Sequence, residues 1–365
     1  MVVACQDAPV SSDTSAPPAS ESATSVGPRA TDQAPVARDH LLFLDSAQHE
    51  LVVANSLGTE VQHVGDVGNP TSPLSVDPSG HRVAYWREAP GGVELVVWDR
   101  VSTSLKVIVT ELELSPWAAP LWTADGSAVV MTLASPPSLA PPGMFPARGR
   151  LELVSASGGA ARMLATYANA GPIIPLFADA DIIAGFRLGM TDSSYVVLDT
   201  KTAVARSETR ASGFRFFGFA AQGRMAWGLI SEFESTKPAT LRVWPVDDYA
   251  REVARMDLMA PGIPVAWPGR TEIAFSAGGA TPGGPYEIRA LDYASGSSRI
   301  VGVVGLGGTP AAFSSDGSAL FVYQSTASQY VLARSSNGTL SAAAPYRVAG
   351  RRDDPTLRFV GWLRP

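Results

Sequence analysis

The sequence lacks several features that would narrow its function at once. Cys5 is the only cysteine in 365 residues, so the chain can form no disulfide within itself. A chain of this length does not need one, because it can bury a large core. Apolar runs such as residues 151–155 and 301–306 are far shorter than the ~20 residues of a membrane-spanning helix. The net charge is −6, and Lys and Arg are scattered along the chain. We therefore expect a globular protein that neither spans a membrane nor binds nucleic acid.

Catalytic and metal-binding motifs are missing as well. The sequence contains no H-E-x-x-H, G-x-S-x-G, P-loop or C-x-x-C motif. The histidines have no metal-ligand spacing and are expected at the surface; they are His40, His49, His63 and His81. The acidic pairs do not complete a calcium loop and are expected to be turn carboxylates; they are Asp179/Asp181, Asp247/Asp248 and Asp353/Asp354. The sequence thus predicts no metal and no cofactor.

The N-terminal segment differs from the rest of the chain. Residues 2–5 read Val-Val-Ala-Cys, which is similar to a bacterial lipobox, although only residues 1–4 precede Cys5. Residues 6–39 are rich in Ser, Ala, Pro and Thr and contain almost no large apolar side chains. Such a segment cannot bury enough surface to offset its chain entropy. We expect residues 1–39 to be a disordered tether with lipid on Cys5; the alternative is a free thiol in an unstructured tail.

A repeat runs through the rest of the sequence. From about Leu41 onward, an apolar residue and a few polar residues lead to a Gly, and a run of Val, Ala and aromatic residues follows. Clear copies lie about 47 residues apart, with one longer gap that residues 179–181 fill; their glycines are Gly80, Gly126, Gly223, Gly269 and Gly317. Asp or Ser begins a tight turn and Gly supplies its positive φ, so each copy predicts a β-hairpin.

The repeat has the length and strand content of a β-propeller blade. Each copy continues into a second hairpin, so a period of about 40–50 residues holds four strands. Residues 41–64 form such a copy without its innermost strand, and residues 357–363 resemble an innermost strand without a blade. We predict an all-β fold over residues 40–365: a seven-bladed β-propeller of four-stranded blades. The C-terminal strand would close the ring by joining the N-terminal blade.

The copies also resemble a known kind of repeat. The pattern apolar-x-x-(Asp)-Gly-x-x-apolar-Ala-aromatic, as in residues 76–86, resembles the repeats of TolB-like, WD-repeat-like bacterial propellers. The resemblance covers about residues 41–365, and a true Trp-Asp pair occurs only at Trp98-Asp99. It implies an architecture used by binding scaffolds, periplasmic partners, non-catalytic peptidase domains and some enzymes. The recurrent aromatic residues are expected to pack between blades; they are Trp122, Phe219 and Phe313.

Long loops predict where a partner would bind. If the Gly turns join the first and second strands of each blade, the loops between second and third strands share the opposite face, and residues 134–149, 231–239 and 277–285 are the long ones. We expect binding by Met144, Phe145, Arg148 and Glu232, of which Met144 and Phe145 lie in a Pro-stiffened loop. The alternative is that these loops are tolerated insertions.

The function predicted from these features is binding without catalysis. We expect an exported, monomeric propeller at the cell surface or in the periplasm, held to the membrane only through Cys5. One face would dock a protein or a cell-envelope polymer. The alternative is an enzyme, a propeller lyase or glycosidase with acid and base groups around the central channel. A channel lined by Asp, Glu, His and Arg would favour the enzyme, whereas an apolar channel would favour the binding protein.

Overall fold

The fold was determined from a computed structural model. It describes residues 39–65, 67–135, 148–168, 171–188, 193–211, 214–220, 224–230, 238–258, 262–278, 286–304, 308–325, 327–341, 343–349 and 357–365. Contacts divide the chain into Met1–Gln33 and Ala34–Pro365, and all described residues belong to the second unit. In the described residues, no helix has the length and apolar character needed to cross a membrane.

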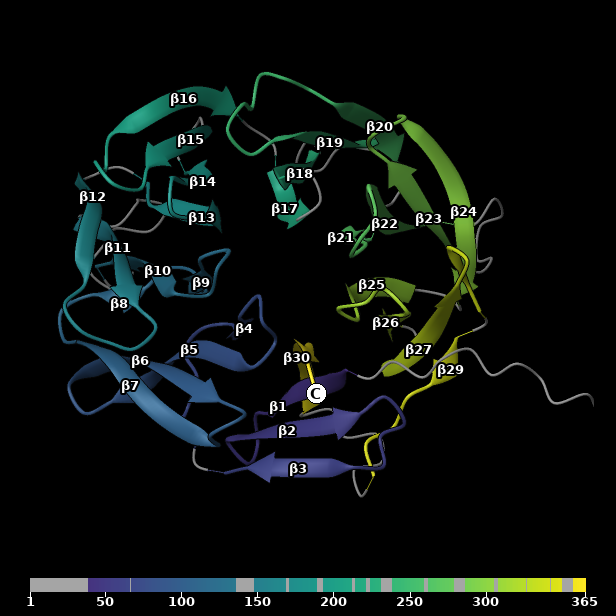
Figure 1. Ribbon diagram of the computed structural model, residues 1–365, viewed down its shortest axis with the longest axis horizontal. Helices are drawn as coiled ribbons and strands as arrows, with labels where there is room; N and C mark the ends of the chain where they lie inside the picture. Colours follow the sequence, from purple (N-terminus) through teal and green to yellow (C-terminus); the bar gives the residue numbers. More distant parts are fainter. Residues whose placement is uncertain are drawn as a thin grey trace, which may run out of the picture. The chain divides into compact units, whose positions relative to one another are not determined.

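Seven antiparallel sheets form the blades of a β-propeller around a common centre (Figure 1). Each blade is given from its innermost to its outermost strand. Blade 1 contains β30 (Leu357–Leu363), β1 (His40–Asp45), β2 (Glu50–Asn55) and β3 (Val61–Val64). Blade 2 contains β4 (Ser75–Val76), β5 (Arg82–Ala89), β6 (Gly92–Asp99) and β7 (Ser104–Glu111). Blade 3 contains β8 (Ser115–Pro116) and β9 (Leu121–Trp122), which both pair with β10 (Ala128–Ala134), then β11 (Arg148–Ser155) and β12 (Arg162–Ala168).

The remaining blades repeat this order. Blade 4 contains β13 (Ile173–Ala178), β14 (Ile182–Arg187), β15 (Ser193–Asp199) and β16 (Ala205–Ala211). Blade 5 contains β17 (Phe214–Ala220), β18 (Met225–Ile230), β19 (Ala239–Pro245) and β20 (Ala254–Leu258). Blade 6 contains β21 (Val265–Ala266), β22 (Glu272–Ala277), β23 (Tyr286–Asp292) and β24 (Ser297–Val304). Blade 7 contains β25 (Gly308–Phe313), β26 (Ala319–Gln324), β27 (Gln329–Ser336) and an outer strand in two pieces, β28 (Thr339–Leu340) and β29 (Ala344–Pro345). The predicted seven-bladed fold is confirmed.

Strand order gives the propeller two faces. Because neighbouring strands are antiparallel, the connections between first and second strands and between third and fourth strands share one face, here named the turn face. The connections between second and third strands and between successive blades share the other, here named the loop face. The strand ends that flank the long loops singled out in the sequence therefore lie on the loop face.

The Gly turns form as the sequence predicts. Between β4 and β5, the Asp77 carboxylate accepts hydrogen bonds from the backbone N–H groups of His81 and Arg82, both at 2.9 Å. Gly80 in this turn has φ 74°, a left-handed conformation that costs glycine no steric strain. Gly126, Gly269 and Gly317 have φ between 68° and 71° at the same place in their blades. The turn chemistry thus fixes the hairpin that begins each of these blades.

Aromatic side chains join neighbouring blades. The indole N–H of Trp122 in blade 3 donates to the Ser75 carbonyl of blade 2 at 2.9 Å, and Trp267 in blade 6 donates to the Gly317 carbonyl of blade 7 at 3.1 Å. The Trp267 ring also stacks on Phe313, with centroids 4.4 Å apart. Phe219 of blade 5 lies 4.7 Å from Phe177 of blade 4, measured between ring centroids. The predicted packing of these aromatic residues between blades is confirmed.

The two ends of the propeller meet in blade 1. β30 pairs with β1 along its length, from His40 opposite Leu363 to Asp45 opposite Leu357. The pairing contains one register shift next to Leu42. Trp362 at the end of β30 donates its indole N–H to the Ala312 carbonyl of blade 7 at 3.1 Å. The C-terminal strand therefore closes the ring in the predicted way and binds blade 1 to blade 7.

His40 at this closure is expected to make stability depend on pH. Burial, and then the nearby Arg100, lower the pKa of His40 from its ordinary value of 6.5, against smaller opposing effects of Glu60 and Asp39. The unfolded chain then takes up the proton before the folded chain does, so the free energy of unfolding should fall as pH drops below 6.5 and level off below the lowered folded pKa. Chemical denaturation at a series of pH values measures this slope.

The matched variants are His40→Gln and His49→Asn. His49 lies in the exposed turn between β1 and β2 with φ 53°, a conformation that Asn tolerates. We expect His40→Gln to flatten the pH dependence just below 6.5 and His49→Asn to leave it as in the wild type. An unchanged slope in His40→Gln would show that another group causes the acid sensitivity.

Candidate functional site

The innermost strands of the seven blades, which surround the central channel, carry few charged residues. The innermost strands β30, β4, β8, β9, β13, β17, β21 and β25 contain no Asp, Glu or His, and their only charged residues are Arg215 and Arg358. Phe216 on β17 is 40% exposed, and Leu121, Val265 and Val360 are half-buried. General acid and base catalysis needs titratable groups within hydrogen-bond reach of the substrate. The described channel strands do not provide a pair of such groups.

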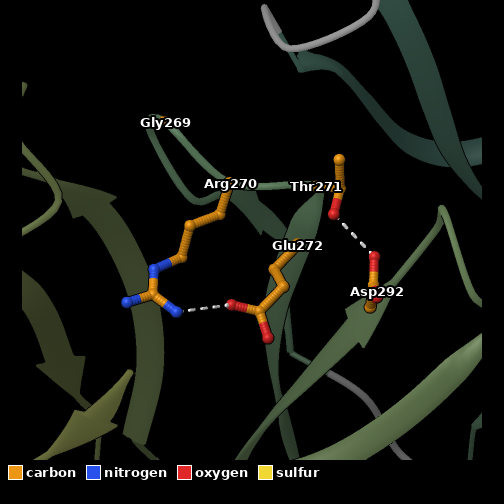
Figure 2. Close-up of a pocket in the computed structure, with 5 residues that line it drawn as sticks. All are labelled: Gly269, Arg270, Thr271, Glu272 and Asp292. Carbon is orange, nitrogen blue, oxygen red and sulfur yellow. Dashed lines mark hydrogen bonds and ion pairs between the residues drawn. The ribbon is translucent and has the colours of Figure 1, made fainter. Parts of the chain in front are cut away.

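A hollow on the turn face, shown in Figure 2, contains several charged side chains that bind one another. Glu272 accepts a two-pronged interaction from Arg299 at 2.7 and 3.0 Å and also pairs with Arg270 at 3.3 Å. Arg299 reaches on to the Gly338 carbonyl of blade 7 at 2.7 Å. Thr271 donates to Asp292 at 2.7 Å, and this hydroxyl, together with Ser295, lowers the pKa of Asp292. These contacts connect blades 6 and 7. The charged side chains of this hollow therefore bind one another and are not available to bind a ligand.

The strongest candidate site is a pocket of about 320 Å³ beside blade 3, facing blade 2. It begins at the loop-face end of β11 and extends along β12. Arg148 on β11 and Glu113, in the connection after β7, form an ion pair at 3.0 Å whose side chains are 63% and 68% exposed. Met163 on β12 is 52% exposed, and the Tyr167 ring and Leu114 complete an apolar wall. The pocket therefore combines an exposed ion pair with an apolar surface.

A buried ionic cluster holds the floor of this pocket in place. Arg150 lies between two buried carboxylates: it pairs with Glu152 at 2.9 Å and binds Glu111 on its other side. The second oxygen of Glu111 accepts the backbone N–H groups of Glu113 and Leu114 at 2.9 and 3.0 Å. A buried carboxylate is stable only when its hydrogen bonds are satisfied in this way. The cluster positions the segment that carries Glu113 opposite Arg148.

Tyr167 and Gly149 shape the apolar wall. Tyr167 donates its hydroxyl to the Leu133 carbonyl at 2.8 Å, and burial raises the pKa of the phenol, so the group stays neutral. A Cβ on Gly149 would lie 2.0 Å from the Tyr167 ring and 2.6 Å from the Leu133 carbonyl oxygen. The absence of a side chain at residue 149 therefore lets the Tyr167 ring rest on the strand and form a flat surface in the pocket.

Of the binding residues predicted from the sequence, Arg148 lies in this pocket. Met144, Phe145 and Glu232 lie outside the described residues, as does Cys5. Sequence reasoning missed Glu113, Met163 and Tyr167. Glu113 follows the end of β7, and no short pattern in the sequence marks it as the partner of Arg148. Met163 and Tyr167 also carry no signal of their own, because their place in the pocket depends on the neighbouring strand.

Solved structures with a similar fold include several bacterial propellers. An oligogalacturonate lyase in complex with manganese shares 13% identity and a TM-score of 0.57, over 80% of this chain and 81% of that one. The periplasmic gluconolactonase PpgL of Pseudomonas aeruginosa shares 17% identity and a TM-score of 0.54, over 90% of this chain and 99% of that one. TolB from Acinetobacter baumannii is also among the neighbours, with 13% identity, a TM-score of 0.45, and coverage of 84% of this chain and 66% of that one. No protein-family description and no curated sequence matches the chain.

These likenesses define the class of protein. The chain is a seven-bladed β-propeller, and at these identities the neighbours show the fold alone. Among the described residues, no group of three or more His, Cys, Asp or Glu side chains could hold a metal ion.

Proposed function

We propose that the chain is a non-catalytic binding propeller that docks a protein partner in the pocket between Arg148 and Tyr167. The observation that carries this proposal is the pocket itself, an open apolar wall next to an exposed ion pair on a rigid blade. Protein interfaces commonly have an apolar centre with a polar rim. A partner side chain could contact Met163 and the Tyr167 ring, and a charged partner group could exchange with Arg148 or Glu113.

A further feature supports binding at this place. Leu112, which precedes Glu113 in the connection between blades 2 and 3, is a large apolar side chain that is 68% exposed. Exposed apolar side chains beside a pocket are common in binding surfaces. Met144 and Phe145, which the sequence also predicts as binding residues, lie outside the described residues.

The enzyme alternative has less support. The neighbours include an oligogalacturonate lyase and a gluconolactonase, but at 13% and 17% identity they show only the fold. The described innermost strands carry two arginines, Arg215 and Arg358, and no Asp, Glu or His with which a general acid and base pair could be formed. A binding function requires only the pocket and the exposed Arg148–Glu113 ion pair.

We further propose that the propeller is exported and anchored by lipid on Cys5, with residues 6–39 as the tether. The support is the lipobox-like sequence and the composition of the segment that follows it. A tethered propeller at the cell surface or in the periplasm would meet its partner in the cell envelope. Membrane fractionation of wild type and Cys5→Ser tests the anchor: the wild type should sediment with membranes and the variant should not.

Partner capture is tested by crosslinking in a native-like host. The double variant Arg148→Ala/Met163→Asp removes the ion pair and places a charge on the apolar wall. The matched control is Arg255→Ala/Val204→Asp, because Arg255 is an exposed arginine on the outer strand of blade 5 and Val204 is 62% exposed on the turn face. We expect the pocket variant to capture its partner at least about tenfold less than the wild type, and the control to capture it equally.

The results separate the possible partners. A protein that crosslinks to wild type and control but is lost from the pocket variant supports the proposal. An envelope polysaccharide that shows the same dependence, with no protein, would identify a polymer-binding propeller instead. Equal capture by all three proteins would exclude this pocket as the docking site. Circular dichroism and thermal unfolding of each variant confirm that the fold is retained.

A further inference from the structure

Met163 is the exposed methionine in the part of the chain that the structure describes. Its side chain on β12 is 52% exposed and lines the pocket of Arg148. Met131 on β10 is fully buried, by contrast, and Met225 and Met256 are half-buried. The oxidation of a sulfur-containing side chain depends on how far an oxidant in solution can reach it. Among the described methionines, Met163 is therefore the one that an oxidant meets first.

The sulfur chemistry of the chain depends on methionine. Cys5 is the only cysteine, whereas the sequence contains eight methionines. The proposed lipid on Cys5 would convert its thiol into a thioether, so no free thiol would remain. A two-electron oxidant such as hydrogen peroxide then finds thioethers as its sulfur targets, and it converts methionine to methionine sulfoxide. A redox response of this chain would therefore act through an accessible methionine.

Met163 provides part of the apolar surface of the pocket. Met163 and the Tyr167 ring belong to its apolar wall, and the Arg148–Glu113 ion pair forms its exposed polar side. Oxidation turns the flexible, apolar methionine side chain into a polar one, and this change disrupts interfaces that contain methionine. A partner side chain that packs on the thioether would lose that contact once the sulfoxide forms.

A hydrogen-bond donor for the new oxygen lies in the same pocket. Met163 is opposite Glu152 in the pairing of β12 with β11, so the two side chains share one face of the blade. Arg150 lies on that face, two residues before Glu152, and also lines the pocket. Its Nε and Nη2 atoms bind Glu152 and Glu111, and within the described residues its Nη1 atom makes no ion pair. Nη1 can therefore donate to a sulfoxide oxygen on Met163.

We propose that Met163 is a site of reversible oxidation, and that its sulfoxide releases the partner from the Arg148 pocket. The proposal rests on the proposed docking function, because it concerns the regulation of the same pocket. The sulfur lone pair attacks hydrogen peroxide, an S–O bond forms, the O–O bond breaks, and the peroxide is reduced to water. The sulfoxide oxygen then binds Arg150 and draws the side chain away from the apolar wall. Methionine sulfoxide reductases reverse the change: the oxygen leaves as water while a dithiol is oxidised to a disulfide.

The first measurement follows the oxidation of the purified, full-length protein by hydrogen peroxide. Peptide mass spectrometry gives the sulfoxide fraction at each methionine over time. We expect Met163 to be oxidised at least about tenfold faster than the buried Met131. Equal rates at these two residues would overturn the proposal. Circular dichroism of the oxidised protein confirms that the fold is retained.

The second measurement repeats the crosslinking capture with untreated, oxidised and reductase-treated protein. We expect oxidation to lower capture by the wild type at least about fivefold and the reductase to restore it. Met163→Leu keeps an apolar side chain of similar volume that cannot form a sulfoxide, so it should capture the partner as the wild type does and retain capture after oxidation. The matched control is Met256→Leu, on the outer strand of blade 5, which should stay as sensitive to oxidation as the wild type.

The docking proposal and the oxidation proposal fail in different ways. Equal capture by the wild type and by Arg148→Ala/Met163→Asp, before any oxidant is added, excludes the pocket and with it both proposals. Capture that depends on the pocket but persists when Met163 is fully oxidised overturns the oxidation proposal alone. Loss of capture by oxidised Met163→Leu also overturns it, because another residue, such as Met144, would then be the one that responds.

Discussion

Replacing Trp362 with Ala is expected to lower the free energy of unfolding by about 3–5 kcal/mol, the cost typical of removing a large buried aromatic side chain. Trp362 is 8% exposed, lies on the strand that closes the ring, and belongs to the core cluster shared by blades 1 and 7. Its indole N–H binds the Ala312 carbonyl of blade 7 at 3.1 Å. The substitution thus removes packing and an interblade hydrogen bond at the point where the ring has no covalent continuity.

Denaturation in guanidinium chloride measures this effect. The control is Arg358→Ala, on the same strand but exposed, which should change the free energy of unfolding by no more than about 0.5 kcal/mol. If Trp362→Ala unfolded at the same denaturant concentration as the control, the closing strand would not limit the stability of the ring. If the closing strand stabilises the ring, Trp362→Ala must unfold at a lower denaturant concentration than Arg358→Ala.

Gly149→Ala is expected to destabilise the protein by about 1–3 kcal/mol, in the range of overpacked sites. The added methyl group would lie 2.0 Å from the Tyr167 ring and 2.6 Å from the Leu133 carbonyl oxygen, so the ring must move. Tyr167 is anchored by its hydroxyl, which donates to the same carbonyl at 2.8 Å. Displacing the ring would break this bond and reshape the wall of the pocket, so we also expect weaker partner capture.

The matched control is Gly278→Ala, which follows β22 in blade 6. A Cβ at Gly278 meets no other atom within 4 Å, so this substitution should leave stability and capture close to wild type. A double-mutant cycle with Tyr167→Ala isolates the clash: the methyl group should cost less once the ring is gone. Equal costs in both backgrounds would show that contact with the Tyr167 ring is not the cause.

The fold could be predicted because its information is local and repeated. Each Gly turn contains its own Asp or Ser acceptor and its own positive φ, as Asp77 and Gly80 show, and these lie a few residues apart in the sequence. The closing strand was recognisable because residues 357–363 have the pattern of an innermost strand and no partners of their own. Residues 41–64 form a blade that lacks its innermost strand, so residues 357–363 can complete the ring only by pairing with that blade.

The candidate sites could be predicted only in part, because their contacts cross between blades. Arg148 was predicted as a binding residue and lines the pocket, and whether it binds a partner stays a prediction. Its ion-pair partner Glu113 lies 35 residues earlier in another connection. Arg150 and Glu111 are 39 residues apart. Spacing along the chain therefore predicts the blades better than the surfaces between them.

The pairing of β1 with β30 also determines on which side of the ring the propeller can be attached to another molecule. β1 begins at His40 and β30 ends at Leu363, and these two residues lie opposite each other on the turn face. A support, a fusion partner or a tether joined at either end would therefore attach on the same side of the ring. The loop face with the Arg148 pocket would then point away from the attachment, free to meet a large partner. The two ends could equally be joined to each other and the chain opened at another blade, because the ring has no structural beginning.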